Sequence, residues 1–456
     1  MALLSLQYRR PKKVDSEAYR QRREALEDSA EGSVKSGVSG ASSGIPDALC
    51  FDRIINGGTC PPLAIRDFMN YLVYVEHAAE NLQFYLWFKN YEKRFAEAKG
   101  SDVSLAPEWT QAMEDEAVAK VRREQVDKMR REPAATAAIF KGTDFEKQPC
   151  GKKANPFNTP PRSPNGVSED HDTLTTSWET MTSDGTSNAQ STSNANSRTQ
   201  AAEAFVTAGA RLPLPVLAVT IQPFHQEINR IITSYLMDGA PRQLNLAAWE
   251  QRATVQALSH TTHPSAFRIL FKSVDSALRL QSHPNFIRWS ICNGNLPRVW
   301  FARFLGIALI IIGFVIAIVL TLSRAGRGYR VLPLIAWVLG MSTLVAAHKG
   351  MCVVLHGLHH RHVRPWELFT QDDGEEFGMS NMESFGSNNS YEDEPWVVKY
   401  QERNIVRKIF DREIWIQEPA LRQIQDTIFC QALLAGLVFG LIFMAVFLAV
   451  PGGHFF

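Results

Sequence analysis

Residues 68–95 read FMNYLVYVEHAAENLQFYLWFKNYEKRF, and this stretch decides the fold. Apolar side chains recur at helical spacing on both sides of a short polar turn at 77–81. Aromatic side chains crowd the half that follows the turn, namely Phe84, Tyr85, Trp87, Phe88 and Tyr91. The pattern predicts a long amphipathic helical segment that is interrupted at the turn.

Three apolar runs stand out from the polar background of the chain. They span 304–322, 331–347 and 428–450, and none of them contains Lys, Arg, Asp or Glu. About 20 helical residues cross a hydrocarbon core of roughly 30 Å, so the first and third runs are long enough and the second is marginal. Burial in a soluble core is disfavoured because the runs have no polar face to present to water. The expected transmembrane helices lie at 301–323, 331–348 and 428–450.

Composition excludes several classes of protein. With 456 residues the chain is long enough for two or three domains. A net charge of +1 gives no support for nucleic-acid binding. The six cysteines are scattered, without the spacing of a metal site or a disulfide framework. The first 23 residues lack the sustained apolar region of a signal peptide, so the soluble part is expected in the cytosol.

The remaining sequence alternates between expected disorder and expected order. Residues 1–48 are expected to be a disordered arm, because Ser, Gly and Ala dominate its later part. A long insertion at 99–211 is expected to be largely disordered apart from a charged helix at 112–131. Helical patterns occupy 49–98 before this insertion and 212–295 after it. These two segments are expected to be the halves of one split domain.

The half that follows the insertion shows four helical patterns. Apolar periodicity indicates helices at 223–237, 249–258 and 265–280, with a loop at 239–246 between the first two. Ser282 is the expected N-cap of a last short helix.

These segments resemble the regulator-of-G-protein-signalling (RGS) family. In that family a short turn ending in Glu-Asn precedes an aromatic-rich helix that closes with a Tyr and basic residues, as Glu80-Asn81 and Tyr91-Glu92-Lys93 do here. The later half follows the same order: a helix, a loop with an apolar-Asn-apolar triplet centred on Asn245, a helix pair and a final helix. The resemblance implies an all-α RGS-like helical bundle, split by the long disordered insertion and followed by about three transmembrane helices. This arrangement, a split RGS-like bundle followed by apolar helices, resembles that of a fungal-type, membrane-anchored member of the family.

The resemblance also implies a function. RGS proteins bind the active Gα subunit of a heterotrimeric G protein and accelerate its GTP hydrolysis. Gα already carries its catalytic Arg and Gln, so its partner fixes the switch loops and needs no catalytic group of its own. The implied Gα-binding residues come from the turn, the loop and the start of the final helix: Glu80, Asn81, Asn245, Gln281, Ser282 and Asn285.

Three positions depart from the family pattern. Gln281 and Asn285 stand where typical members offer an acid and an arginine, and Ala247 stands where an acid usually follows the loop triplet. The departures leave the fold intact and bear on the strength of GTPase activation. Taken without the resemblance, Glu80-Asn81 could simply be a turn that caps a helix, and Asn245 could be an ordinary loop residue.

Two other functions therefore stay open. The first is a non-catalytic Gα-binding scaffold or sorting factor in a membrane. The second is a small transporter or channel with a cytosolic regulatory domain. The three apolar runs contain no Lys, Arg, Asp or Glu, which disfavours a transport path.

Charge asymmetry sets the expected topology. Lys and Arg are frequent in the 349–427 loop and absent from the tail after 450, so the positive-inside rule places the RGS-like domain and this loop in the cytosol. Arg324, Arg327 and Arg330 in the short loop after the first run argue against this topology and would better suit a hairpin that does not fully cross. We nevertheless expect three spans, with the N-terminal part in the cytosol and the tail outside. We expect a multi-pass protein of the plasma membrane or an endomembrane.

The 349–427 loop contains two recognisable parts. One is an acidic linker at 371–394, and the other is an amphipathic, basic helix at 396–417. Such a helix suits the surface of an anionic leaflet, with membrane lipids as partners. Packing of this helix against the bundle is an equally supported alternative.

A histidine cluster follows the second apolar run. Helical spacing would place His356, His359 and His360 on one face, with His362 nearby, and imidazoles are zinc ligands. No carboxylate is close in sequence and the only nearby thiol is Cys352, so a juxtamembrane polar cluster is favoured and neither a metal nor a cofactor is expected. The chain has no P-loop, no Rossmann glycines and no HExxH motif, and we do not expect an enzyme.

Overall fold

The computed structural model describes residues 8, 10–29, 44–98, 100–140, 222–370, 389 and 395–452. In these residues the chain is mostly helical, and strands form one two-stranded sheet. The chain divides into two compact units, Met1–Thr110 with Val219–Phe456, and Gln111–Ala218. Two predictions lie outside the described residues: the disorder of the insertion beyond residue 140, and the acidic linker at 371–394 apart from Asn389.

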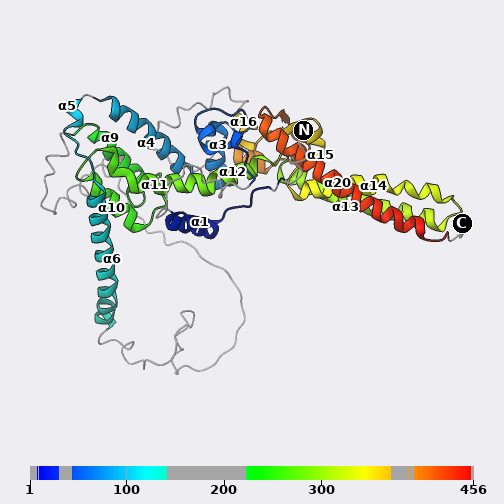
Figure 1. Ribbon diagram of the computed structural model, residues 1–456, viewed down its shortest axis with the longest axis horizontal. Helices are drawn as coiled ribbons and strands as arrows, with labels where there is room; N and C mark the ends of the chain where they lie inside the picture. Colours follow the sequence, from blue (N-terminus) through cyan, green and yellow to red (C-terminus); the bar gives the residue numbers. More distant parts are fainter. Residues whose placement is uncertain are drawn as a thin grey trace, which may run out of the picture. The chain divides into compact units, whose positions relative to one another are not determined.

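Short helices from both sides of the insertion build a bundle in the larger unit (Figure 1). Before the insertion they are α1 (Ser16–Ser29), η2 (Asp47–Leu49), α2 (Phe51–Ile55), α3 (Ile65–Tyr71), η3 (Leu72–Glu76), α4 (Ala79–Glu97) and α5 (Gly100–Val103). After it they are α9 (His225–Ile231), η5 (Ile232–Leu236), α10 (Ala248–Leu258), η6 (Pro264–Phe267), α11 (Arg268–Ala277), η7 (Leu278–Ser282) and α12 (His283–Ser290). In the smaller unit, α6 (Gln111–Phe140) covers the charged stretch.

The aromatic-rich helix α4 forms the centre of the bundle. Its Phe84 and Tyr91 are fully shielded from solvent. From the other side of the insertion, Phe267 packs on four α4 rings at centroid distances of 5.5–6.1 Å. The Tyr91 hydroxyl donates to the Thr262 carbonyl, which satisfies its polar end. Since full burial of a large apolar side chain stabilises by about 1.5–3 kcal/mol, this cluster holds the two halves of the chain together.

The first half of the bundle extends beyond residue 98. Trp109 is 5% exposed, and its ring stacks on His260 at 5.6 Å. Its backbone N–H donates to the Ser265 hydroxyl at 2.8 Å. The expected boundary at 98 is therefore too early, and the compact unit continues to Thr110.

The prediction that residues 1–48 form a disordered arm is wrong for residues 10–29, which include α1. Val14 is 1% exposed, and its backbone exchanges two hydrogen bonds with the Asn285 side chain at 2.8 and 2.9 Å. Arg10 donates to two backbone carbonyls at 2.6 and 2.7 Å. Composition missed this order because the segment is held by distant partners rather than by its own apolar content.

The last helix of the bundle does not begin at Ser282. The α11 helix, the π-helical turn η7 and α12 follow one another without a break. Ser282 has helical dihedral angles and makes no capping hydrogen bond, so its predicted N-cap role is wrong. Pro284 sits at the start of α12, and the wider turn before it accommodates a ring that an α-helical interior would reject.

Buried His283 ties α12 to the first half of the chain. Its side chain is buried, and Nε2 donates to the Leu49 carbonyl at 2.8 Å. Burial lowers the pKa of His283 to about 4, so the imidazole is neutral near pH 7.

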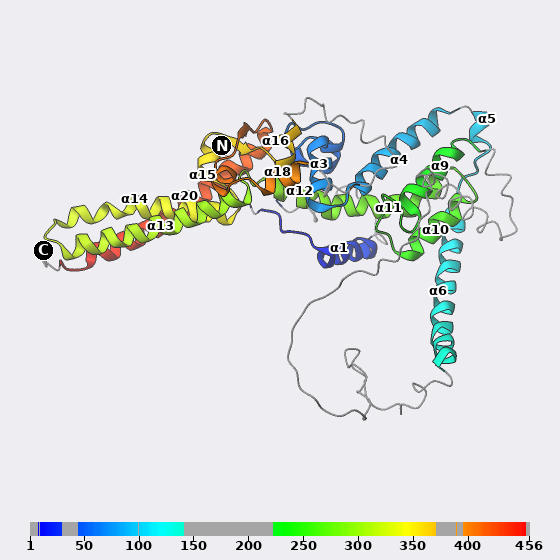
Figure 2. The same ribbon diagram turned by 180° about the vertical axis from the view of Figure 1, so that it is seen from behind.

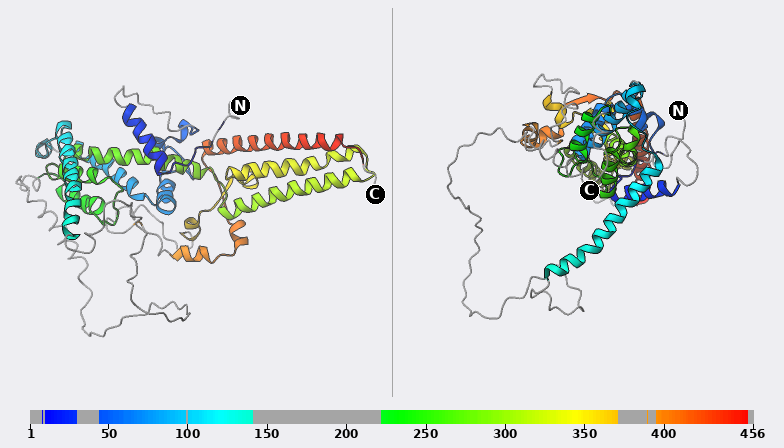
Figure 3. Two further views of the ribbon diagram at one scale, coloured as in Figure 1. Left: turned by 90° about the horizontal axis from the view of Figure 1, so that it is seen from below. Right: turned by 90° about the vertical axis from the view of Figure 1, so that its left-hand side faces the viewer.

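Three helical segments are long and apolar enough to cross a membrane: Leu296–Leu322, Arg327–His348 and Pro419–Ala449. The first is α13 (Leu296–Leu322), the second joins η8 (Arg327–Val331) to α14 (Pro333–His348), and the third is α20 (Pro419–Ala449). They run side by side in Figures 1 and 2, and Figure 3 shows α14 between α13 and α20.

Glycines bring these three helices into backbone contact. A Cβ added at Gly306 in α13 would lie 2.9 Å from the Gly340 carbonyl oxygen in α14. One added at Gly436 in α20 would lie 2.7 Å from the Val338 carbonyl oxygen of α14. The small residues of α20 therefore permit close packing within this chain, against α14.

The helix α20 begins at Pro419, well before the predicted start at 428. The Glu418 side chain caps it by accepting from the Ala420 N–H. Its first turns pack on the bundle, where fully buried Gln425 donates to the Ile291 carbonyl at 3.1 Å. The apolar run located only the part of the helix that lies beyond these polar turns.

Arg330 has a structural partner at the end of α20. Its side chain is 2% exposed, and Nη1 donates to the carbonyls of Phe447 at 3.0 Å and Val450 at 2.5 Å. These carbonyls lie at the negative end of the helix dipole, where a cation is stabilising. Arg330 thus caps α20, which explains why an arginine occupies the start of the second candidate span.

The predicted helix at 396–417 is wrong. Two short helices, α18 (Pro395–Gln401) and α19 (Ile405–Ile409), are followed by the strand β2 (Glu413–Trp415). Asn404 begins α19 by accepting from the Val406 N–H at 3.0 Å. The backbone of β2 pairs antiparallel with β1 (His360–His362) instead of continuing a helix. The helix α15 (Val353–Gly357) lies between α14 and β1, and α16 (Pro365–Thr370) follows β1.

His283 predicts a pH-dependent stability. Its folded pKa of about 4 lies below the ordinary 6.5, so protonation of the unfolded chain destabilises the fold as pH falls between these values. We expect a loss of about 3 kcal/mol across this window from this residue. His283→Gln, which keeps a donor for Leu49, should remove this part of the pH dependence in thermal unfolding of the detergent-solubilised chain. The exposed His348→Gln serves as the control, and a wild-type pH profile in His283→Gln would refute the assignment.

Backbone contact at Gly436 predicts intolerance of even one methyl group. Gly436→Ala places Cβ 2.7 Å from a backbone oxygen, so α20 must move away from α14. We expect a destabilisation of about 1–3 kcal/mol, as for other overpacked sites, seen as a lower Tm in detergent. At Gly326 an added Cβ meets nothing within 4 Å, so Gly326→Ala should leave Tm unchanged. Equal Tm values for the two variants would contradict the close helix packing.

Candidate functional site

The residues singled out from the sequence lie in three segments of the bundle. Glu80 and Asn81 are in the first turn of α4, immediately after a chain reversal at His77. His77 has the left-handed φ of 56°, and the Ala78 N–H donates to the Leu72 carbonyl at 3.0 Å. This reversal ends η3 and starts α4, and it leaves Glu80 and Asn81 half-buried.

Tyr235 connects this turn to the loop that carries Asn245. Burial raises the pKa of Tyr235, the Glu80 charge raises it further, and a hydrogen bond with Arg242 lowers it. The backbone N–H of Leu244 donates to the Tyr235 carbonyl at 3.0 Å, which pins the loop to η5. Asn245 follows and is exposed. The acid of the turn therefore acts electrostatically on the same tyrosine to which the loop of Asn245 is bonded.

The start of α12 lies beside the same turn but is covered. The Ser282 hydroxyl donates to Glu76 at 2.9 Å, four residues before Glu80 along the chain. Ser282 is 2% exposed and Asn285 is 8% exposed. Both amide atoms of the Asn285 side chain are bonded to the Val14 backbone, whereas Gln281 is half-buried. The N-terminal segment thus occupies the third part of the face that the sequence predicted.

The segment after α14 also contacts α4 and η3 beside this turn, which the sequence did not indicate. Asn389 and Gln83 exchange two amide hydrogen bonds at 3.1 and 3.3 Å. Burial raises the pKa of Glu80, and a hydrogen bond with Asn389 partly offsets this. The Tyr74 ring stacks on Trp366 at 4.7 Å. The sequence offered one signal of this contact: an aromatic residue stands on each side of the acidic linker expected at 371–394.

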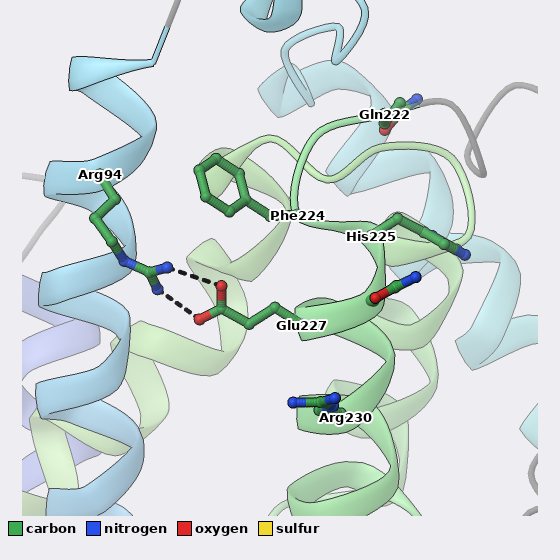
Figure 4. A pocket seen from close by; sticks show the side chains of 7 residues that line it. Arg94, Gln222, Phe224, His225, Glu227 and Arg230 are labelled. Atoms are coloured by element: carbon green, nitrogen blue, oxygen red, sulfur yellow. Dashed lines mark hydrogen bonds and ion pairs between the residues drawn. The ribbon is translucent and has the colours of Figure 1, made fainter. Parts of the chain in front are cut away.

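A pocket of about 600 Å³ lies at the other end of α4 (Figure 4). Arg94 from α4 and Glu227 from α9 form a bidentate ion pair across it, with contacts of 2.5 and 2.9 Å. Burial alone would raise the pKa of Glu227, but hydrogen bonds from Arg94 and from Trp87 lower it. Each charge is neutralised by its partner, so this pair fixes α9 to α4 and offers no free group for catalysis. The pocket is lined by Arg94, Gln222, Phe224, His225, Gln226, Glu227 and Arg230.

The histidines after α14 do not share a helical face. The helix α15 ends at Gly357, so His356 lies on a helix, His359 in a turn and His360 on a strand. His356 and His359 instead approach Asp426 in α20, and their ligand atoms lie within 4.8 Å of one another. The sequence missed this carboxylate because it is near only in space. Among the described residues this is a group that could hold a metal ion.

No family model, curated protein or solved structure matches this chain. The arrangement of its own residues is therefore the basis for assigning a function. That arrangement is a mostly helical chain with three candidate membrane spans and a helical bundle that carries Glu80, Asn81 and Asn245.

Proposed function

We propose that this protein is a membrane-anchored regulator that binds the active Gα subunit of a heterotrimeric G protein and accelerates its GTP hydrolysis. The proposal rests on the half-buried Glu80 at the start of α4, whose charge acts on Tyr235, and on the exposed Asn245, whose neighbour Leu244 donates to the Tyr235 carbonyl at 3.0 Å. The sequence that supplies them resembles the RGS signature in both halves of the chain.

In this proposal the chain contributes positioning rather than chemistry. The carboxylate of Glu80 and the exposed amide of Asn245 would hold the Gα switch loops in their transition-state arrangement. The attacking water and the charged groups that stabilise the transferred phosphoryl belong to Gα. The three apolar helices would keep this face close to the membrane where lipid-bound Gα resides.

A second candidate is Gα binding without activation, in a scaffold or sorting role. The covered start of α12 favours it, because Asn285 is already occupied by the Val14 backbone. Gln281 and Asn285 also replace the acid and the arginine of typical members. Single-turnover GTP hydrolysis by purified Gα, with the full chain in lipid nanodiscs, separates the two candidates. A rate unchanged at saturating binding would leave only the scaffold.

Glu80→Lys tests the contact surface itself. Reversing this charge should weaken binding to Gα loaded with a transition-state analogue by more than about tenfold, or about 1.4 kcal/mol, measured by surface plasmon resonance. Glu97→Lys reverses an exposed charge on the same helix and should bind like the wild type. Matching Tm values exclude loss of fold as the cause. Wild-type affinity in Glu80→Lys would show that Gα does not bind at this turn.

Asn245→Ala tests the positioning role. A group that acts mainly in the transition state should change the hydrolysis rate more than the affinity, so we expect about a tenfold slower rate with a smaller change in Kd. Asn90→Ala, at an exposed asparagine of α4, is the matched control. An equal loss in rate and affinity would assign Asn245 to binding alone.

A further inference from the structure

A group of metal-ligating side chains gathers where the bundle meets α20. His356 lies in α15, His359 follows it in a turn, and Asp426 lies in the early part of α20. One ligand atom from each lies within 4.8 Å of the others. His356 is 5% exposed, whereas Asp426 is exposed. One side of the group therefore faces the interior and the other is open to solvent.

The distance between His356 and Asp426 suits a shared ion better than a direct hydrogen bond. His356 Nε2 and a carboxylate oxygen of Asp426 are 3.4 Å apart, beyond the usual 2.7–3.2 Å of an N–H···O bond. With zinc-ligand distances of about 2.0–2.1 Å, two ligands of a tetrahedral ion lie about 3.3–3.4 Å from each other. The separation of nitrogen and oxygen thus equals that expected around a central zinc ion.

The two imidazoles are also held in position by the backbone. His359 adopts the left-handed φ of 53°, a conformation that a non-glycine residue adopts at some cost. Its N–H donates to the His356 carbonyl at 2.8 Å, and its carbonyl accepts from the Ile416 N–H at 3.0 Å. These two bonds fix the turn that brings the two rings to a centroid distance of 5.8 Å. Nδ1 of each ring is buried and has no hydrogen-bond partner within the described part of the chain.

We propose that His356, His359 and Asp426 bind one Zn²⁺ ion, with water at the fourth position. Two imidazoles and one carboxylate are a ligand set that zinc accepts, and the exposed side of Asp426 leaves room for the water. The ion joins the turn before β1 to α20 and so ties the loop between the spans to the third span. Through this link zinc stabilises the junction of the bundle with the membrane helices.

The test uses the full chain, purified in detergent without a polyhistidine tag and without chelator. Elemental analysis should find about one zinc per chain, and ZnCl₂ should raise Tm reversibly, with EDTA removing the gain. Co²⁺ replacing zinc should give the visible absorption of a tetrahedral site. A wild-type chain that holds no zinc and shows no Tm response to ZnCl₂ would overturn the proposal.

Asp426→Asn is the diagnostic variant, because it keeps the size of an exposed side chain and removes its charge. It should weaken zinc binding by at least about tenfold, as should His359→Ala. Glu413→Gln is the matched control: this acid lies 3.8 Å from His360 and 3.9 Å from His362, the neighbouring histidines. Tm values equal to the wild type in EDTA show that the variants fold. Zinc lost in Glu413→Gln and retained in Asp426→Asn would place the ion elsewhere and refute this site.

Discussion

Burial of the aromatic face of α4 is the constraint on which the bundle depends. Phe267 covers four of its rings, and the Tyr91 hydroxyl bonds to a carbonyl 171 positions further along the chain. Because the covering residues lie beyond the insertion, the face is buried only when both halves of the chain meet. The entropy of closing a loop grows slowly with its length, so a long insertion between the halves costs little compared with this core.

Buried polar contacts link this core to the chain before α15 and to the first turns of α20. The Asn293 side chain bonds both backbone groups of Cys352 at 2.7 and 3.1 Å, and Gln425 bonds the Ile291 carbonyl. A buried donor or acceptor left without a partner costs about 1–3 kcal/mol. These contacts therefore disfavour any shift of the segments relative to one another. The chain around Cys352 and the first turns of α20 thereby belong to the same compact unit as the bundle. The His356–Asp426 group lies at this junction.

The predicted contact residues differ in how available they are. Asn245 is exposed, and Glu80 and Asn81 are half-buried, so they can meet a partner with little rearrangement. Asn285, by contrast, has its amide occupied by Val14, and Ser282 bonds Glu76. The sequence pointed to these positions through the turn and the loop triplet. It could not show that Asn285 is covered, because its partner is an N-terminal segment whose own composition gave no sign of order.

The sequence alone determined the helical class and the three candidate spans. Both are local properties: apolar spacing along a helix and the length of a charge-free run are complete within about 20 residues. Only the tertiary structure decided that residues 10–14 bond to α12 and α1 contacts η7, that 396–417 divides into helices and a strand, and that Asp426 approaches His356. In each case the deciding interaction is a hydrogen bond or an approach of polar groups between residues distant in sequence. Such partners are selected by the packing of the whole chain, and no local pattern encodes them.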